Sequence, residues 1–297
     1  MNGKCRRIAA LLIAACLMFG MPGLADAVQQ GPDFACAVGS ALYLFKDNSL
    51  EVWEDGEVSS IHPAPDEWKE ETAETEKRRY ILCLFAKDDA LMALSAQTEL
   101  CLATGQTRID LLQTGRIVCE ENGPMRFLAE EEIDPGALKD GFGLSPIAHA
   151  VSCGDALYLH LQDGRLLRCM PGGSIEDTGI HGVISVCTYR GGQLLVCHRA
   201  DQLCLTALDP AAESAELLWS ANPEEQAPLR SMAYSPKMDR LYSMDGCICM
   251  ETDLKTGESR AVGFLPYGGD YAGFVLPDGT YAAVSFGGVG VLMPKDD

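Results

Sequence analysis

The chain has 297 residues and a formal net charge of −20 at pH 7. Such an acidic surface repels polyanions, so it argues against a nucleic-acid partner and against binding to anionic lipid. After the N-terminal region, no stretch is apolar over the length of about 20 residues that a bilayer-spanning helix needs. The sequence therefore predicts no stable membrane span beyond that region.

The N-terminus has the pattern of an export signal. Lys4, Arg6 and Arg7 form a basic start, residues 8–19 form an apolar run, and Ala25-Asp26-Ala27 matches a small-x-small cleavage site. This pattern predicts a signal peptide over residues 1–27 and a protein that is secreted or extracytoplasmic.

Two alternatives for this region stay open. The apolar run also suits a retained membrane anchor, although Gly20 and Pro22 follow it closely. Ile13-Ala14-Ala15-Cys16 is similar to a bacterial lipobox, which would make the chain a cell-surface lipoprotein through Cys16. The residues after Cys16 stay apolar through Leu24, whereas a lipoprotein normally turns polar at once.

Six later stretches repeat one short pattern, in which a Leu-Tyr-like pair opens the second of several short strands. Apolar and polar residues alternate within the strands, and turn residues such as Asp163-Gly164 separate them. A repeat of about 40 residues made only of strands is typical of a propeller. We therefore predict an all-β fold, a β-propeller with six blades, and leave seven open. The copies begin at Ala41-Leu42, Ala90-Leu91, Ala156-Leu157, Gln193-Leu194, Arg240-Leu241 and, more weakly, Thr280-Tyr281.

The blades are placed at residues 34–61, 79–112, 147–180, 182–220, 229–265 and 270–293, within one domain that spans residues 28–297. The last blade has only three strand patterns. A complete blade has four strands, so we predict that residues 28–33 supply the fourth and close the ring. In the second blade we expect residues 90–94 and 99–103 to be separate strands.

Two insertions interrupt the repeat. Residues 62–79 are charged and are expected to form a loop with a short helix near Ala64-Pro65-Asp66. Residues 114–146 are longer and acidic, and segments 116–120 and 125–129 have the pattern of a hairpin. If that hairpin belongs to a further blade, the count becomes seven.

Thirteen cysteines are present, of which eleven follow residue 27. An odd number cannot all pair, and their scattered spacing is unlike a disulfide framework. Most lie within strand patterns, so we expect them to act as small buried apolar residues, with Cys101 and Cys204 in matching repeat positions. Cys247-x-Cys249 lacks a second Cys or His pair at zinc-site spacing. We expect no metal and no cofactor.

No phosphate loop, Gly-x-Ser-x-Gly or His-Glu-x-x-His motif occurs, so the sequence identifies no catalytic residues. His149 lies on a first strand, which in a propeller lines the central channel, but a satisfied core or channel histidine is the simpler explanation. His62 and His181 are expected in loops. Aromatic residues in loops above a channel can contact a ligand. The candidate binding residues are Tyr267, Trp68, Trp219, His181 and His149, although Trp219 ends an apolar strand and is expected to be buried.

The repeated Leu-Tyr pattern over residues 34–293 resembles the broad group of bacterial TolB-like and related six- or seven-bladed propellers. This resemblance implies a fold more than an activity, because the group contains binders, scaffolds and a few enzymes. We hypothesise a monomeric, non-enzymatic module that binds a protein, peptide or glycan through its loop face. The alternative is a hydrolase or lyase that acts on a saccharide or a similar small substrate in the channel.

Overall fold

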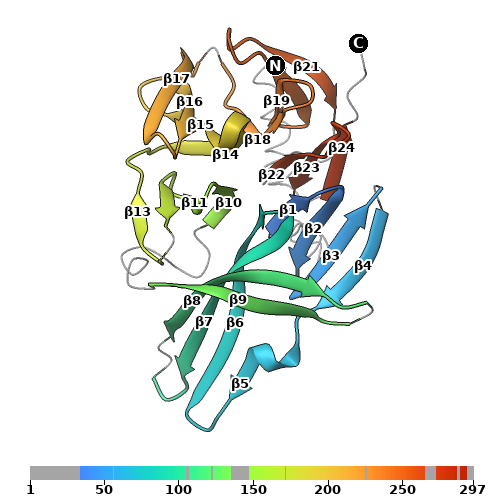
Figure 1. The fold of residues 1–297 in the computed structure, drawn as a ribbon, viewed down its shortest axis with the longest axis vertical. Helices are drawn as coiled ribbons and strands as arrows, with labels where there is room; N and C mark the ends of the chain where they lie inside the picture. The colour runs from blue at the N-terminus through green and yellow to red at the C-terminus, as the bar shows by residue number, and fades with distance from the viewer. Residues whose placement is uncertain are drawn as a thin grey trace, which may run out of the picture.

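The protein is a six-bladed β-propeller. The computed structural model describes residues 34–292 except 56, 105–106, 122, 135–146, 171, 225, 265–271 and 286–287. Within these residues the regular structure is β-strand, with short 3-10 turns and no α-helix. Figure 1 shows the six sheets arranged around a common centre. None of the helical segments in this part of the chain has the length and hydropathy needed to cross a membrane.

The strands follow chain order within each blade. Blade one contains β1 (Phe34–Val38), β2 (Ala41–Lys46), β3 (Ser49–Glu54) and β4 (Glu57–Pro63). Blade two contains β5 (Lys69–Glu71), β6 (Thr75–Lys87), β7 (Ala90–Cys101), β8 (Thr107–Cys119) and β9 (Met125–Ile133). Blade three contains β10 (Ile147–Cys153), β11 (Ala156–Leu161), β12 (Leu166–Cys169) and β13 (Ile175–Asp177).

The remaining blades follow the same scheme. Blade four contains β14 (Val183–Tyr189), β15 (Gln193–Arg199), β16 (Leu203–Asp209) and β17 (Ser214–Ala221), with the 3-10 turn η3 (Arg190–Gly192) between its first two strands. Blade five contains β18 (Arg230–Ser235), β19 (Arg240–Asp245), β20 (Ile248–Thr252) and β21 (Ser259–Phe264). Blade six contains β22 (Ala272–Val275), β23 (Tyr281–Ser285) and β24 (Gly288–Leu292). The fourth strand predicted for blade six, residues 28–33, lies outside the described residues.

The repeated leucines hold neighbouring blades together. Leu42, Leu157, Leu194 and Leu241 are all buried on second strands, and each belongs to an apolar cluster between two blades. Strand alternation explains this, because every second side chain of a strand points to the same neighbouring sheet. The innermost strands contact one another in ring order from β1 to β22, and β22 contacts β1 again.

Blade two differs from the prediction. β7 is one continuous strand from Ala90 to Cys101, so the expected separate strand at residues 99–103 is wrong. The intervening residues 95–98 contain no Gly or Pro and stay paired with β6, so the strand continues without a turn. Cys101 therefore ends a second strand, and its predicted match with Cys204 on the third strand β16 is wrong. Both side chains are only half-buried, whereas seven of the eleven free cysteines are buried.

Most of the described residues of the two predicted insertions belong to the blade-two sheet. Residues 62–79 contain the end of β4, the expected short helix as η1 (Asp66–Trp68), then β5 and the start of β6. The expected hairpin forms from β8 and β9, with Val118 paired to Arg126, and provides the outer strands of blade two rather than a seventh blade. Part of this sheet projects from the ring as an extension (Figure 1). The extension consists of β5 and the outer halves of β6, β7 and β8.

Candidate functional site

One end of the central channel opens into a cavity of about 530 Å³. The first residues of the inner strands line it, together with residues at the turns between second and third strands. This is the end toward which each outer strand returns the chain to the next inner strand. A ligand pocket in a protein typically has a volume of about 300–1,000 Å³, so the cavity suits a small molecule or one end of a longer one.

Strand irregularities shape this cavity. Pairing between the inner and second strands shifts between Ile147 and His149, between Val183 and Ser185, and between Arg230 and Ala233. A β-bulge bends its strand and redirects a side chain. The bulged segments line the cavity, with Ser231 at a φ of 49°. The pairing in blade two shifts in the same way between Ile81 and Cys83, so four blades have a bulge at this end of the channel.

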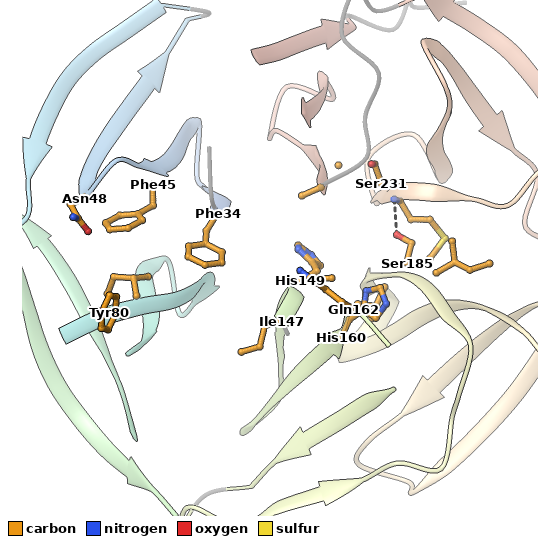
Figure 2. A pocket seen from close by; sticks show the side chains of 17 residues that line it. Phe34, Phe45, Asn48, Tyr80, Ile147, His149, His160, Gln162, Ser185 and Ser231 are labelled. Carbon is orange, nitrogen blue, oxygen red and sulfur yellow. Dashed lines mark hydrogen bonds between the residues drawn. The ribbon is translucent and has the colours of Figure 1, made fainter. Parts of the chain in front are cut away.

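Aromatic rings form one wall of the cavity. Phe34 at the start of β1 stacks on Phe45 at the end of β2, with ring centroids 6.3 Å apart and planes at 26°. Tyr80 of β6 lies beside them, as Figure 2 shows. The turn that follows Phe45 places Asn48, at a φ of 58°, on the rim. Asn tolerates the left-handed region that a two-residue hairpin turn requires.

Two histidines and two serines form the opposite side (Figure 2). His149 and His160 are directly paired across β10 and β11. The Nε2–H group of His160 lies 3.0 Å from the carbonyl oxygen of Val183 and donates to it. The Ser185 hydroxyl oxygen accepts a 3.0 Å hydrogen bond from the backbone N–H of Met232, which joins blades four and five at the cavity wall.

Both histidines are held in the neutral form. Burial lowers the pKa of His149 to about 4, and the nearby His160 ring acts in the same direction. Burial also lowers the pKa of His160, while its hydrogen bond to Val183 opposes the shift. At pH 7 the rings therefore act as neutral hydrogen-bonding groups, and none of the described residues that line the cavity carries a charge.

His149 separates this cavity from a smaller one. The second space, about 170 Å³, lies further along the inner strands and shares His149 and Gly273 with the first. The His149 and Phe274 rings make a T-shaped contact, with centroids 6.3 Å apart and planes at 60°. The position predicted from the sequence, on a channel-lining first strand, is the one observed.

Of the other candidate residues, the three that the structure describes do not line either cavity. Trp219 is buried on β17 between blades four and five, as expected for the end of an apolar strand. Trp68 in η1 packs against the cluster between blades one and two. His181 is exposed between β13 and β14. Tyr267 lies outside the described residues.

Sequence reasoning missed Phe34, Phe45, Asn48, Tyr80 and Gln162. It searched the long loops, whereas these residues lie in or beside strands and turns that the pattern already placed. The expectation that His62 lies in a loop is also wrong. His62 is buried in β4, and its Nδ1 atom lies 3.0 Å from the carbonyl oxygen of Gly123 in blade two.

A metal site is not assembled in the described part of the chain, where no three His, Cys, Asp or Glu side chains come together. In particular, the Cys247-x-Cys249 pair gains no further ligand among these residues. Cys249 is buried on β20, where it packs between blades five and six.

No protein-family model matches the sequence, and no curated protein matches it. Solved structures do match. A streptogramin B lyase aligns with a TM-score of 0.54 at 11% identity, over 90% of this chain and 94% of that one. A chain of the mitotic checkpoint complex aligns with a TM-score of 0.53 at 10% identity, over 90% of this chain and 87% of that one.

An extracellular domain of the putative hybrid two-component system BT4673 from Bacteroides thetaiotaomicron has a TM-score of 0.50 at 12% identity. That match covers 90% of this chain and 42% of the other. At these identities the similarity shows the fold alone. The comparisons therefore support the architecture and nothing finer: the chain has the fold of a six-bladed β-propeller.

Proposed function

We propose that the protein is a non-enzymatic, extracytoplasmic binding module that holds an uncharged part of a glycan or peptide in the cavity at the channel end. The observation that carries this proposal is the chemical contrast between the cavity and the whole chain. The chain has a net charge of −20, whereas the described lining of the cavity combines aromatic rings with neutral hydrogen-bonding groups.

The contacts suit a neutral polar ligand. Phe34, Phe45 and Tyr80 offer ring faces and edges against which an apolar face of a sugar or side chain packs. Asn48, Gln162 and His149 offer donors and acceptors that would orient its hydroxyl or amide groups. Apolar lining with a few convergent polar groups is the usual composition of a ligand site.

Binding is favoured over saccharide hydrolysis by the same side chains. Most glycoside hydrolases use two carboxyl groups on either side of the scissile bond. The described lining residues supply aromatics and neutral histidines instead. The N-terminal signal pattern supports an extracytoplasmic location, and the fold is one that an extracellular bacterial domain also has.

The test is a calorimetric screen of neutral oligosaccharides, acidic oligosaccharides and short uncharged peptides. We expect a neutral ligand to bind with an affinity that does not change with ionic strength, because no charge pair forms. Gln162→Ala and Asn48→Ala should each weaken binding by roughly tenfold, the loss of about one ligand hydrogen bond.

Phe264→Ala is the matched control, since Phe264 is 68% exposed on the outer strand β21 and does not line the cavity. Mass spectrometry of the recovered ligand should show no cleavage. Salt-dependent binding of charged ligands alone, or equal effects of all three substitutions, would disprove the proposal.

A further inference from the structure

The cavity wall continues into the extension of blade two. Tyr80 lines the cavity, and from there β6 runs back along the chain to Thr75 in the extension. Side chains two residues apart point to the same face of a strand, so Glu76 and Arg78 share the face of Tyr80. The pairing of β6 with β7 has no register shift over these residues. One row of side chains therefore leads from the cavity along the extension.

This face of the extension is turned toward blade three. On β7 it carries Ala96 and Thr98, which pair with Tyr80 and Arg78, and on β8 it carries Ile109, which pairs with Thr98. Ile109 and Tyr80 both pack against the apolar cluster between blades two and three. Ala96 and Thr98 are buried, so the more exposed side chains of this face lie on β5 and β6.

Four charged side chains stand on this part of the face. They form a charge quartet that consists of Lys69, Glu71, Glu76 and Arg78. Lys69 is directly opposite Arg78 across the two strands, and Glu71 is directly opposite Glu76. Like charges in this arrangement are unfavourable, so each cation needs a partner elsewhere.

Each cation of the quartet pairs with the carboxylate on its own strand. The Nζ atom of Lys69 lies 3.2 Å from Oε2 of Glu71. The Nε–H group of Arg78 donates a hydrogen bond to Oε1 of Glu76. In a chain with a net charge of −20, the quartet is therefore a locally neutral surface that still offers charged donors and acceptors.

Tyr80 connects the quartet to the cavity. The hydrogen bond with Glu76 raises the pKa of Arg78, and a hydrogen bond with the Tyr80 side chain acts in the same direction. The guanidinium group thus lies between the cavity wall and the next charged group along the strand. The side chains of Lys69, Glu71 and Arg78 are about half exposed, so they keep hydrogen-bonding capacity for a ligand.

We propose, building on the function proposed above, that the charge quartet is a second part of the binding site and that the ligand is a neutral glycan chain. The end of the chain lies in the cavity, and the units that follow pass Tyr80 onto β5 and β6. From Tyr80 to Glu76 the strand covers roughly 13 Å at about 3.3 Å per residue, which is longer than one sugar ring.

The chemistry of the quartet favours a glycan over other chains. A sugar hydroxyl group both donates and accepts hydrogen bonds, so neighbouring hydroxyl groups suit cations and carboxylates that stand side by side. A polyanion or polycation would be attracted by one half of the quartet and repelled by the other. An extended peptide commonly binds through the backbone groups of a strand edge, whereas the quartet lies on a face.

The test measures the affinity of neutral oligosaccharides by calorimetry as a function of chain length. The probes are sugars prepared from starch, cellulose and chitin, each from the monosaccharide to the hexasaccharide. We expect at least one series in which the affinity rises roughly tenfold or more once the chain is long enough to leave the cavity. This rise should not change with ionic strength, because the quartet has no net charge.

Substitutions separate the two parts of the site. Arg78→Ala and Lys69→Ala should each weaken binding of the long chains by roughly tenfold and leave binding of the monosaccharide unchanged. Arg126→Ala is the matched control, because Arg126 is also exposed and paired with a glutamate, Glu120 at 3.1 Å, but lies near the β8–β9 turn. Equal effects of the three substitutions on the long chains would overturn the proposal.

Hydrogen exchange locates the chain without any substitution. With a long chain bound, the amides of residues 69–78 should exchange more slowly than with the monosaccharide bound. Protection confined to the strands of the cavity, or equal affinity for short and long chains, would overturn the second part of the site and leave the cavity as a binding site. Binding of uncharged peptides but of no sugar would also overturn it. Binding of neither would refute the proposed function as well.

Discussion

The hydroxyl group of Tyr281 on β23 donates a 2.8 Å hydrogen bond to the carbonyl oxygen of Ser231 on β18. Both residues are buried, and Ser231 lies in the bulge that lines the channel cavity. This contact joins blades five and six at the point where the inner strand leaves regular geometry.

Tyr281→Phe should reduce the free energy of unfolding by about 1–3 kcal/mol, because it leaves a buried carbonyl oxygen without this donor. Chemical denaturation measures the change. Tyr189→Phe is the control, because the Tyr189 hydroxyl group makes no hydrogen bond with the residues that the structure describes. This variant should stay within about 0.5 kcal/mol of the parent. If the two variants are equally stable, the bond contributes nothing to the junction.

Gly257→Ala should destabilise the protein more than Gly246→Ala. Both glycines have a positive φ, 73° and 61°, so each substitution adds backbone strain of about 1 kcal/mol. Only at Gly257 would the new Cβ atom also lie 3.0 Å from the Trp219 ring. The difference between the unfolding temperatures of the two variants measures the contact between blades four and five. A lower unfolding temperature for Gly246→Ala than for Gly257→Ala would contradict the prediction.

His149 should make folding stability depend on pH. Its pKa is lowered by burial from 6.5 to about 4, so between these values the unfolded chain binds a proton that the folded chain does not. Stability is therefore complete above pH 6.5 and falls as the pH decreases toward 4. The contribution is about 1–3 kcal/mol, reduced because the ring faces an open channel.

Unfolding temperatures of the parent and His149→Gln, measured from pH 4 to pH 7.5, test this point. The variant should lose less stability in acid, while the two proteins are similar at neutral pH. His181→Gln, at an exposed position, should follow the parent curve. Parallel curves for all three proteins would exclude His149 as a source of the acid sensitivity.

The cysteines should differ sharply in reactivity. Burial raises the pKa of the Cys187 and Cys197 thiols to about 12, so little thiolate forms at neutral pH. A side-chain hydrogen bond with Thr104 lowers the pKa of Cys101 at the end of β7. Brief alkylation of the folded protein, followed by peptide mass spectrometry, should label Cys101 well before the other two. In denaturant the three should react alike.

The blade positions could be predicted from the sequence because the repeated residues are those that pack between neighbouring blades. A large apolar residue on each second strand, leucine in five blades and Tyr281 in blade six, is buried against the preceding blade, so its spacing reports the fold directly. Blade two escaped this logic at Leu100, an apolar residue that lies further along the same strand as Leu91 rather than on a new one. Spacing alone does not separate a hairpin from a long strand when turn residues are absent.

The cavity was only partly predictable. His149 was accessible to reasoning because first strands line a propeller channel. Phe45 and Tyr80 could not be predicted as cavity residues. Whether they line the cavity depends on where bulges widen the ring and on how the turn at Asn48 is positioned. Such bulges arise from tertiary packing, and no residue type in these strands marks them.

The extension formed by β5 and the outer halves of β6, β7 and β8 makes blade two different from the other blades of the ring. A ring of near-identical blades allows an approaching macromolecule to bind in several equivalent orientations about the axis of the ring. One protruding sheet makes these orientations different from one another. A macromolecule that binds the extension is therefore held at a fixed rotation relative to the channel opening.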